Sequence, residues 1–569
     1  MFTLFYKKNN NGKLFEHLEE NGFQNVQNYF PLLSNFFKLE DNNYNKINLN
    51  QKYSINLIQA TENNNNFTLS CQDENSNDHI YKSFFKFSPL IDPVKFMVGK
   101  YEKINKSIIE TLPKLKDNGC LDKVMDKNNS AYVDGFFSYL TSQLLHHHSF
   151  SNGLDFYGTF TAVQNKYVCD IFEDLEYLHD AKFFHRNKDI LFEVDHIDTE
   201  RLLESDTRKY RKKIQIDKSK VDLQTDTLNN EMFEGVFELT HDNINKHNNE
   251  LDDEVWKSES SEVKSEKSHK KTNSTCSSRS SNTDGEDEEE ELGDSEDESD
   301  FSDYSSEEEE VIHAYINDFP VQIICLEKME NTLDYLMETK GKHLNNKEWK
   351  SCLFQIIMML ITYQKVFDFT HNDLHTNNIM WNKTDKKFIN YKYNNVYYKV
   401  PTFGKLYKII DFGRAIYKFQ DKIICSDSYH PKGDAATQYN TEPYFDAKKP
   451  RLEPNKSFDL CRLGCSLFDY FMDDEEDEDN IENPVAKVIN EWITDDKNRN
   501  ILYKNNGEER YPDFKLYKMI ARTVHNHTPQ KEIDHIFFSN YRTNKKKMKK
   551  QKVMNIDEYP IMFKSHVSQ

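Results

Sequence analysis

Two short motifs in the second half of the chain restrict its fold more than any other feature. The first, H-N-D-L-H-T-N-N-I, covers residues 371–379 and follows an apolar stretch that predicts a helix at 348–366. The second, K-I-I-D-F-G, covers residues 408–413 and ends a segment at 387–410 that predicts strands. A fold that suits this chain has to bring the polar side chains of these two loops together.

The polar side chains in question are those of Asp373, Asn378 and Asp411. Phosphoryl transfer requires a carboxylate that orients the attacking hydroxyl, together with an amide oxygen and a second carboxylate that bind Mg²⁺. Asp373 suits the first role, whereas Asn378 and Asp411 suit the second. His371 is expected to support the loop from beneath. The motifs therefore predict a site for ATP and Mg²⁺.

The order of the expected elements predicts a mixed α+β fold, with a small β-rich lobe followed by a larger α-helical lobe. Strands are expected within 51–88 and at 154–160, and helices are expected at 93–116 and 131–147. A short link near 327–331 separates the two lobes. The expected divisions are an N-terminal extension at 1–50, an N-lobe at 51–326, a C-lobe at 327–540 and a basic, solvated C-terminal tail at 541–569.

A long acidic insertion is expected to interrupt the N-lobe at 161–315. Residues 284–310 contain 17 Asp and Glu and no Lys or Arg, in a chain whose net charge is −22. Residues 257–310 have almost no large apolar side chains, so we expect disorder, because they cannot bury enough surface to offset the entropy of ordering. The insertion could dock a basic protein partner, although a solvated linker is the simpler interpretation.

The remaining composition argues against several classes of protein. Outside the acidic segment the chain is nearly neutral, so specific nucleic-acid binding is not expected. The nine cysteines have no paired spacing and indicate reduced thiols in an intracellular protein. The longest apolar stretch, at 354–361, is too short to span a bilayer, so no membrane association is expected.

The motifs and their order resemble those of the eukaryotic-type protein kinase superfamily, over roughly residues 50–540 without the insertion. The resemblance implies a two-lobe protein-kinase-like fold in which Asp373 is catalytic, while Asn378 and Asp411 bind the metal. It also assigns Lys86, in S-F-F-K-F-S-P, as the third-strand lysine that binds the α- and β-phosphates of ATP.

The segment V-Q-I-I-C-L-E-K-M-E at 321–330 resembles the strand and hinge that connect the two lobes of such kinases. By this resemblance Leu326 is the gatekeeper and Glu327 is the hinge acid, and backbone groups from Glu327 to Met329 bind adenine. Asp459, in S-F-D-L-C-R-L-G-C, matches the acid that hydrogen-bonds to the catalytic loop.

A closer similarity is to the serine/threonine-protein kinases inferred for large DNA viruses of the iridovirus and mimivirus type. It is based on H-N-D-L-H-T-N-N-I-M-W, I-I-D-F-G-R-A and G-D-A-A-T-Q-Y-N-T-E-P-Y-F, and on the acidic insertion before the hinge strand. The similarity implies transfer of the γ-phosphate to serine or threonine hydroxyls of proteins, in the host cytoplasm or in association with the virion.

Two departures from the kinase pattern support alternatives. No glycine occurs between Gly22 and Gly99, so E-N-N-N-N at 62–66 stands where a glycine-rich loop usually covers the phosphates. This departure favours a weakly active pseudokinase or a scaffold. His375 stands where a lysine is usual, and D-L-H-x-x-N also resembles choline and aminoglycoside kinases, which favours a small-molecule kinase. The D-F-G at 411–413 favours a protein kinase.

Two further positions concern regulation and charge pairing. Asn372 replaces the arginine that usually precedes the catalytic aspartate, so control by a phosphorylated loop docking on that arginine is not expected. The acid that pairs with Lys86 is either Glu102, which has nearly the usual spacing, or Asp134, which lies on the helix just before the next strand.

The interval between Asp373 and Asp411 is longer than is usual in protein kinases. We expect an inserted hairpin around Asn394 and Asn395 to absorb the excess. After Asp411 the chain is expected to be loop-like to about residue 455 and helical at 457–471.

Overall fold

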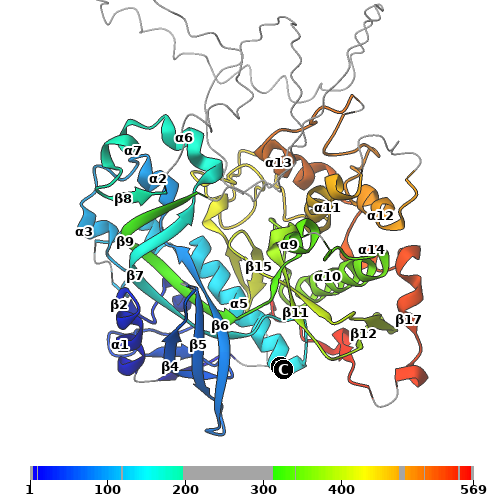
Figure 1. Ribbon diagram of the computed structural model, residues 1–569, viewed down its shortest axis with the longest axis horizontal. Coiled ribbons are helices and arrows are strands. Elements are labelled where there is room, and N and C mark those ends of the chain that lie inside the picture. The colour runs from blue at the N-terminus through cyan, green and yellow to red at the C-terminus, as the bar shows by residue number, and fades with distance from the viewer. Residues whose placement is uncertain are drawn as a thin grey trace, which may run out of the picture. The chain divides into compact units, whose positions relative to one another are not determined.

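A computed structural model of the chain describes residues 4–8, 11–63, 65–116, 119–195, 312–339, 341–472, 481–504, 506–548 and 551–564. All of them belong to one compact unit. The stretch predicted to be disordered, 257–310, lies outside the described residues. Within them the fold is mixed α+β, with a β-rich N-terminal part and a helical C-terminal part (Figure 1).

The N-terminal part is built on one antiparallel sheet in the strand order β2–β7–β9–β6–β5–β4, and β8 pairs with β9. Residues 319–326 of β9 are all buried, because β9 lies between β6 and β7. The register places Lys86 of β6 opposite Ile324 of β9. The strands are β2 (Phe23–Gln27), β4 (Ser54–Ala60), β5 (Asn66–Gln72), β6 (Asp78–Pro89), β7 (Phe156–Asp170), β8 (Phe192–Val194) and β9 (His313–Glu327).

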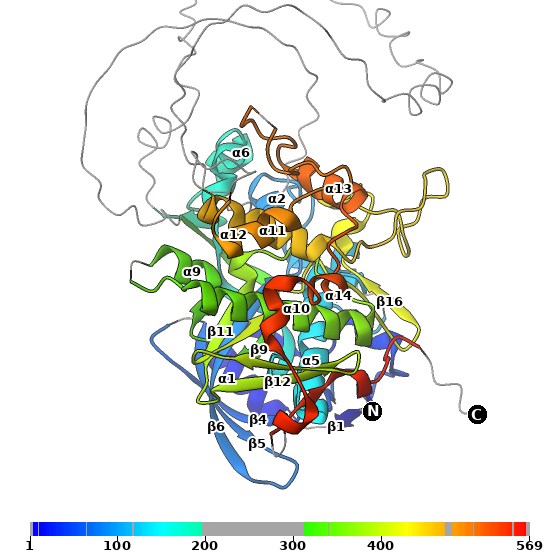
Figure 2. The ribbon, with the colours of Figure 1, turned by 90° about the vertical axis from the view of Figure 1, so that its right-hand side faces the viewer.

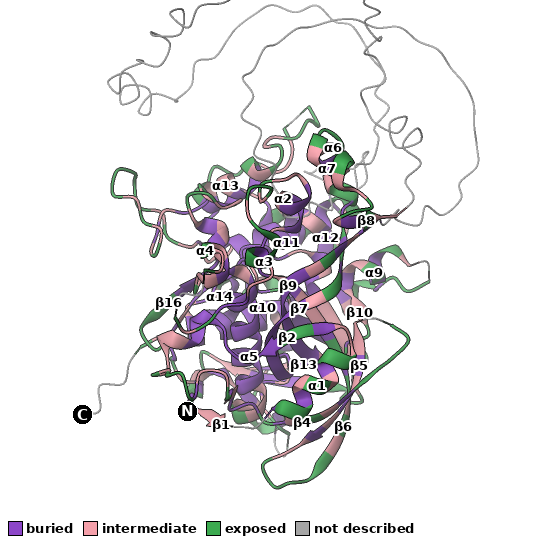
Figure 3. Ribbon diagram, turned by 90° about the vertical axis from the view of Figure 1, so that its left-hand side faces the viewer, coloured by how far each residue is buried: buried purple, intermediate pink, exposed green. Residues whose placement is uncertain are grey.

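Helix α5 (Ser130–His148) packs on this sheet and joins it to the C-terminal part. It begins after Asn129, whose side chain accepts a hydrogen bond from the amide of Ala131 at 3.1 Å, a typical N-cap. Its residues are buried from Ala131 to Leu144, and Figure 3 shows the helix as buried along most of its length. A helix that is buried on every side in this way belongs to the core.

The C-terminal part is organised around the long buried helix α10 (Asn346–Phe367). Asn345 and Glu348 form a capping box at its start. Among the described helices, none is long and apolar enough to cross a membrane. The other main helices of this part are α9 (Leu333–Glu338), α11 (Phe458–Phe471), α12 (Pro484–Trp492) and α13 (Phe514–Thr523).

Several predicted elements are confirmed. The helices expected at 131–147, 348–366 and 457–471 are α5, α10 and α11. The inserted hairpin is also present, as β12 (Phe388–Tyr393) and β13 (Val396–Pro401). Its turn residues Asn394 and Asn395 have φ values of 50° and 61°, the left-handed conformation that tight hairpin turns require and asparagine tolerates.

Other expectations were wrong in detail. The single helix predicted at 93–116 is instead the short helices α2 (Pro93–Met97) and α3 (Lys106–Ile109), because Gly99 has a φ of +84° that a continuous helix excludes. The stretch after Asp411, expected to be a loop, contains the hairpin of β15 (Ile416–Phe419) and β16 (Lys422–Cys425).

The predicted domain boundaries also shift. The N-terminal extension is not separate from the lobe, since β2 pairs with β7 as a strand of the main sheet. The insertion was placed at 161–315, but β7 continues to Asp170 and β9 begins at His313. Residues on both sides of the predicted insertion boundaries therefore belong to the sheet, because the two strands pair along their whole length.

The C-terminal segment is not a solvated tail, which corrects the expectation for 541–569 over its described residues. It supplies β17 (Arg542–Thr543), which pairs with β13, and β18 (Met554–Asn555), which pairs with β12. The Asp557 carboxylate accepts hydrogen bonds from the amides of Asn394 and Asn395 at 2.6 and 3.0 Å. Figure 2 shows this segment, in red, beside α10 and β12.

Burial of this segment predicts a measurable contribution to stability. Ile556 is fully buried, so Ile556→Ala should lower the free energy of unfolding by about 2–5 kcal/mol through lost contacts and a new cavity. Ile561 in the same segment is 41% exposed, and Ile561→Ala should change the value by only about 0.5 kcal/mol or less. Urea unfolding followed by circular dichroism measures both, and equal effects would contradict the packing described here.

Candidate active site

The two sequence motifs meet at the ends of a pair of strands. Strand β11 (Ile379–Lys383) begins directly after Asn378, and its antiparallel partner β14 (Lys405–Ile409) ends just before Asp411. The amide of Ile410 donates to the carbonyl of Asn378 at 3.0 Å, and the Asn378 side-chain nitrogen donates to the carbonyl of Asp373 at 2.9 Å. The register therefore brings both motifs to one edge of this small sheet.

Asp459 of α11 holds the first motif from below. Its carboxylate accepts hydrogen bonds from the amides of His371 and Asn372 at 3.0 and 2.8 Å, as expected for the matched kinase acid. Burial raises the pKa of Asp459, and these amide hydrogen bonds oppose that shift. His371 Nε2 donates to the carbonyl of Ile410 at 2.9 Å, which links the first motif to the second.

Lys86 connects the sheet to both α5 and the second motif. Its Nζ lies 2.6 Å from Asp134 Oδ2 and 2.8 Å from Asp411 Oδ1. Asp134 Oδ1 in turn accepts a hydrogen bond from the amide of Phe412 at 3.0 Å. Glu102, the other acid considered for this pairing, instead forms an exposed ion pair with Arg186. The geometry thus selects Asp134 as the partner of Lys86.

The charges in this cluster stabilise one another. Burial disfavours the ammonium of Lys86, but Asp134 and Asp411 more than compensate and raise its pKa. Burial alone would raise the pKa of Asp411, whereas Lys86 lowers it to about 2. Burial raises the pKa of Asp134 despite the lysine. At neutral pH the cluster therefore presents a charged Lys86 and an ionised Asp411.

Asp411 and Asn378 carry oxygen atoms of the kind that Mg²⁺ prefers. The Asp411 side chain is 46% exposed, and the Asn378 amide nitrogen is engaged by Asp373, which leaves the amide oxygen as the available ligand atom. Over the described ranges, no group of three or more His, Cys, Asp or Glu side chains could hold a metal by itself. Mg²⁺ usually binds one or two carboxylates together with substrate phosphates, so a sparse protein donor set fits this ion.

Asp373 is buried, with 6% of its surface exposed. Its Oδ1 accepts a hydrogen bond from the hydroxyl of Tyr517 at 2.9 Å, and its Oδ2 lies 3.9 Å from Arg414 Nε. Burial opposes ionisation, but Arg414 and His375 lead the effects that lower the pKa of Asp373. Burial lowers the pKa of His375 to about 4, so its ring is neutral and adds no formal charge at neutral pH.

Sequence reasoning missed Arg414 and Tyr517 as neighbours of Asp373. Arg414 directly follows the D-F-G motif, so its proximity to the site was readable from the sequence. Tyr517 comes from α13, far along the chain, and no local pattern signals its contact with Asp373.

The side chain of Glu327 connects several segments of the fold. One carboxylate oxygen pairs with Lys408 and accepts a hydrogen bond from the Asp155 amide at 2.7 Å, while the other accepts one from Asn382 at 2.7 Å. Met329 is buried, and among the described residues no acceptor binds its amide. In the segment 327–331 that connects the two parts of the fold, the amide of Met329 is therefore available as a hydrogen-bond donor. The Glu327 carboxylate is already engaged.

The asparagine-rich turn between β4 and β5 lies next to Lys86. The amide of Phe85 donates to the carbonyl of Asn65 at 2.7 Å, and the Asn65 side chain donates to the carbonyl of Phe85 at 3.2 Å. These two hydrogen bonds fix the turn against β6, beside Lys86. Its side chains limit close backbone approach, in contrast to glycine.

The segment after Asp411 is anchored on α5 by Asp427. Its Oδ1 accepts from the amide of Ser130 at 3.0 Å, and its Oδ2 accepts from Lys123 at 2.5 Å. Asn372 is buried inside its own loop, and its Oδ1 accepts a hydrogen bond from Tyr439 at 2.9 Å. Asp427 is thus fixed to the start of α5, and Asn372 is held within its own loop.

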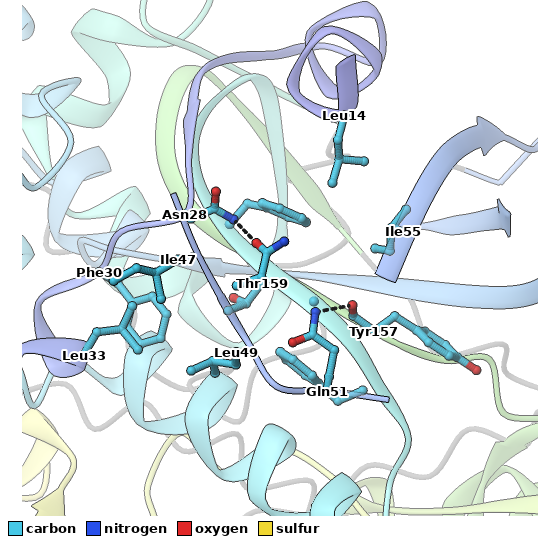
Figure 4. A pocket seen from close by; sticks show the side chains of 14 residues that line it. Leu14, Asn28, Phe30, Leu33, Ile47, Leu49, Gln51, Ile55, Tyr157 and Thr159 are labelled. Carbon is cyan, nitrogen blue, oxygen red and sulfur yellow. Dashed lines mark hydrogen bonds between the residues drawn. The ribbon is translucent and has the colours of Figure 1, made fainter. Parts of the chain in front are cut away.

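A small cavity lies elsewhere, between the N-terminal segment and β7. Polar and apolar side chains line it, among them Asn28, Gln51 and Thr159, which Figure 4 shows around the cavity. Gln51 donates to the carbonyl of Tyr157 at 3.1 Å. None of the candidate residues lines this cavity, so it is separate from the site described above.

Comparison of the chain with protein-family models gave no match, and comparison with curated proteins gave no match either. The candidate site is therefore assigned from its residues and their geometry.

The Lys86 cluster predicts a pH-dependent change in stability. Lys86→Met leaves the buried Asp134 without its cation and should lower the free energy of unfolding by about 3 kcal/mol. The loss should be smaller in mildly acidic buffer than in mildly alkaline buffer, because protonation of Asp134 relieves the unpaired charge.

Denaturant unfolding at both pH values tests this expectation. Lys82 lies on the same face of β6 and is exposed, so Lys82→Met is the matched control and should leave stability nearly unchanged at both pH values. A loss for Lys86→Met that is independent of pH would contradict the proposed charge relief at Asp134.

Proposed function

We propose that this chain is a protein kinase that uses ATP and Mg²⁺ to phosphorylate serine and threonine hydroxyls of proteins. The observation that carries the proposal is the contact of Lys86 with both Asp134 and Asp411, at the edge where Asn378 and Asp373 also lie. In protein kinases a lysine on the third strand pairs with an acid on the following helix, and the D-F-G aspartate binds the metal.

The order of the segments supports a two-lobe kinase fold. Strands β4, β5 and β6 follow one another in the sheet, Lys86 lies on the third of them, and α5 supplies the acid before the next strand of the sheet. The linker after β9 leads directly into the helical part that carries both motifs. The acid is an aspartate in this chain, whereas protein kinases use a glutamate.

Each residue has a distinct role in the proposed reaction. Lys86 contacts the α- and β-phosphates of ATP, and the Met329 amide binds adenine. Asp411 and Asn378 hold Mg²⁺, which would neutralise the charge on the phosphates. Asp373 orients the acceptor hydroxyl and accepts its proton. The proposed role of Glu327 is limited to its backbone, because its side chain joins β9 to β11 and β14.

The similarity to kinases inferred for large DNA viruses supports protein hydroxyls as acceptors. It also supports an intracellular setting, in the host cytoplasm or with the virion. The acidic insertion remains a proposed docking segment for basic proteins. Because Asn372 is uncharged, buried and hydrogen-bonded to Tyr439, it offers no docking site for a phosphorylated residue in the proposed kinase.

One observation favours a second candidate, a kinase for small molecules. Asp373 is 6% exposed and is contacted by Tyr517, so the acceptor has to reach a recessed carboxylate. A small alcohol or amine reaches such a group more easily than a hydroxyl on a folded protein does. His375, in D-L-H-x-x-N, agrees with this alternative.

A transfer assay with γ-labelled ATP and Mg²⁺ separates these functions. The acceptors are casein, myelin basic protein and a panel of alcohols and amines. We expect label in protein serine or threonine, and a loss of about 10²-fold or more in Asp373→Asn and Asp411→Asn. Asp385→Asn, which changes an exposed aspartate outside the site, should retain full activity.

The other outcomes point elsewhere. Label only in small alcohols or amines would support the small-molecule kinase. A thermal shift with ATP and Mg²⁺ but no transfer to any acceptor would support a pseudokinase or scaffold. Full activity in Asp411→Asn would contradict the metal role of that residue.

A further inference from the structure

The two oxygens of the Asp373 carboxylate have different partners. Oδ1 accepts a hydrogen bond from Tyr517 at 2.9 Å, a normal length for two oxygens. Oδ2 lies 3.9 Å from Arg414 Nε, which is an ion pair beyond hydrogen-bond distance. Oδ1 is thus held by the protein, whereas Oδ2 keeps its capacity to accept a hydrogen bond.

The direction of the Tyr517 hydrogen bond is fixed by Arg462 of α11. Arg462 Nε lies 2.9 Å from the Tyr517 oxygen, and an arginine can only donate. The phenol oxygen therefore accepts from Arg462 and donates its own hydrogen to Asp373. Burial raises the pKa of Tyr517, which keeps this hydrogen on the phenol at neutral pH.

The Tyr517 ring has little freedom to move. It is 3% exposed, and it stacks on Phe514 of the same helix with a centroid distance of 5.3 Å. Phe458 lies against it at 5.9 Å, and the guanidinium of Arg462 lies 5.2 Å from the ring centroid. A donor held this firmly fixes the orientation of the carboxylate that it contacts.

We propose that Tyr517 is a positioning residue for the catalytic carboxylate: it holds Oδ1 of Asp373 so that Oδ2 faces the incoming acceptor hydroxyl. This inference depends on the proposed kinase function and adds a residue to its machinery. Helix α13 thereby becomes part of the active site, although it lies outside both sequence motifs.

The proposal predicts a specific kinetic change in Tyr517→Phe, which removes only the hydroxyl. The value of kcat should fall about tenfold or more, because a hydrogen bond to a charged group is lost, while KM for ATP stays unchanged. A lower kcat at an unchanged KM for ATP is the result that distinguishes positioning of Asp373 from a general loss of structure.

Tyr132→Phe is the matched control, since Tyr132 is a fully buried tyrosine whose hydroxyl donates to the carbonyl of Val124 at 2.8 Å away from the site. It should lose similar stability with an unchanged kcat. Thermal unfolding and ATP–Mg²⁺ binding, measured on both variants, identify any general loss of structure.

Three outcomes would overturn the inference. An active wild type with an unchanged kcat in Tyr517→Phe would overturn it and leave the proposed function intact. A faster Tyr517→Phe variant would also overturn it, because the phenol would then compete with the acceptor. A wild type that transfers phosphate to no acceptor would overturn the proposed function and this inference together.

Discussion

The arrangement of the candidate site depends on the ion pairs that the Lys86 ammonium forms. It joins β6, α5 and the end of β14 by contacts with Asp134 and Asp411, which come from segments far apart in the chain. A cation between two carboxylates stabilises all three groups, and the buried carboxylate of Asp134 would be costly without it. The ion cluster therefore defines both the position of α5 and the charge that the site presents.

Helix α5 turns this local contact into a connection between the two parts of the fold. Phe137, on the same helix as Asp134, packs on Phe369 and Phe412 with centroid distances of 4.3 and 4.7 Å. Phe369 lies just before the first motif, and Phe412 belongs to the second. Movement of α5 would thus disturb the ion cluster and both motifs at once, because packed cores resist gradual deformation.

The parts of the candidate site whose residues are close along the chain could be predicted from the sequence. The parts that form where distant segments meet could not. Asp373, Asn378, Asp411 and Asp459 lie in continuous motifs next to regular elements, so their register follows from local pattern. The partner of Lys86 stayed open between two acids, since only packing decides which one points inward. Tyr517, the role of the Glu327 side chain and the buried C-terminal segment depend on long-range contacts that carry no local signal.

The position of β9 has a consequence for how the chain folds during synthesis. This strand separates β6 from β7, yet residues 196–311 are translated between β8 and β9. At ordinary translation rates that interval lasts on the order of ten seconds. Throughout it, β6 and β7 lack their shared partner and present unpaired backbone edges, which are prone to aggregation. Aggregation of the nascent N-terminal sheet is therefore favoured until its central strand has left the ribosome.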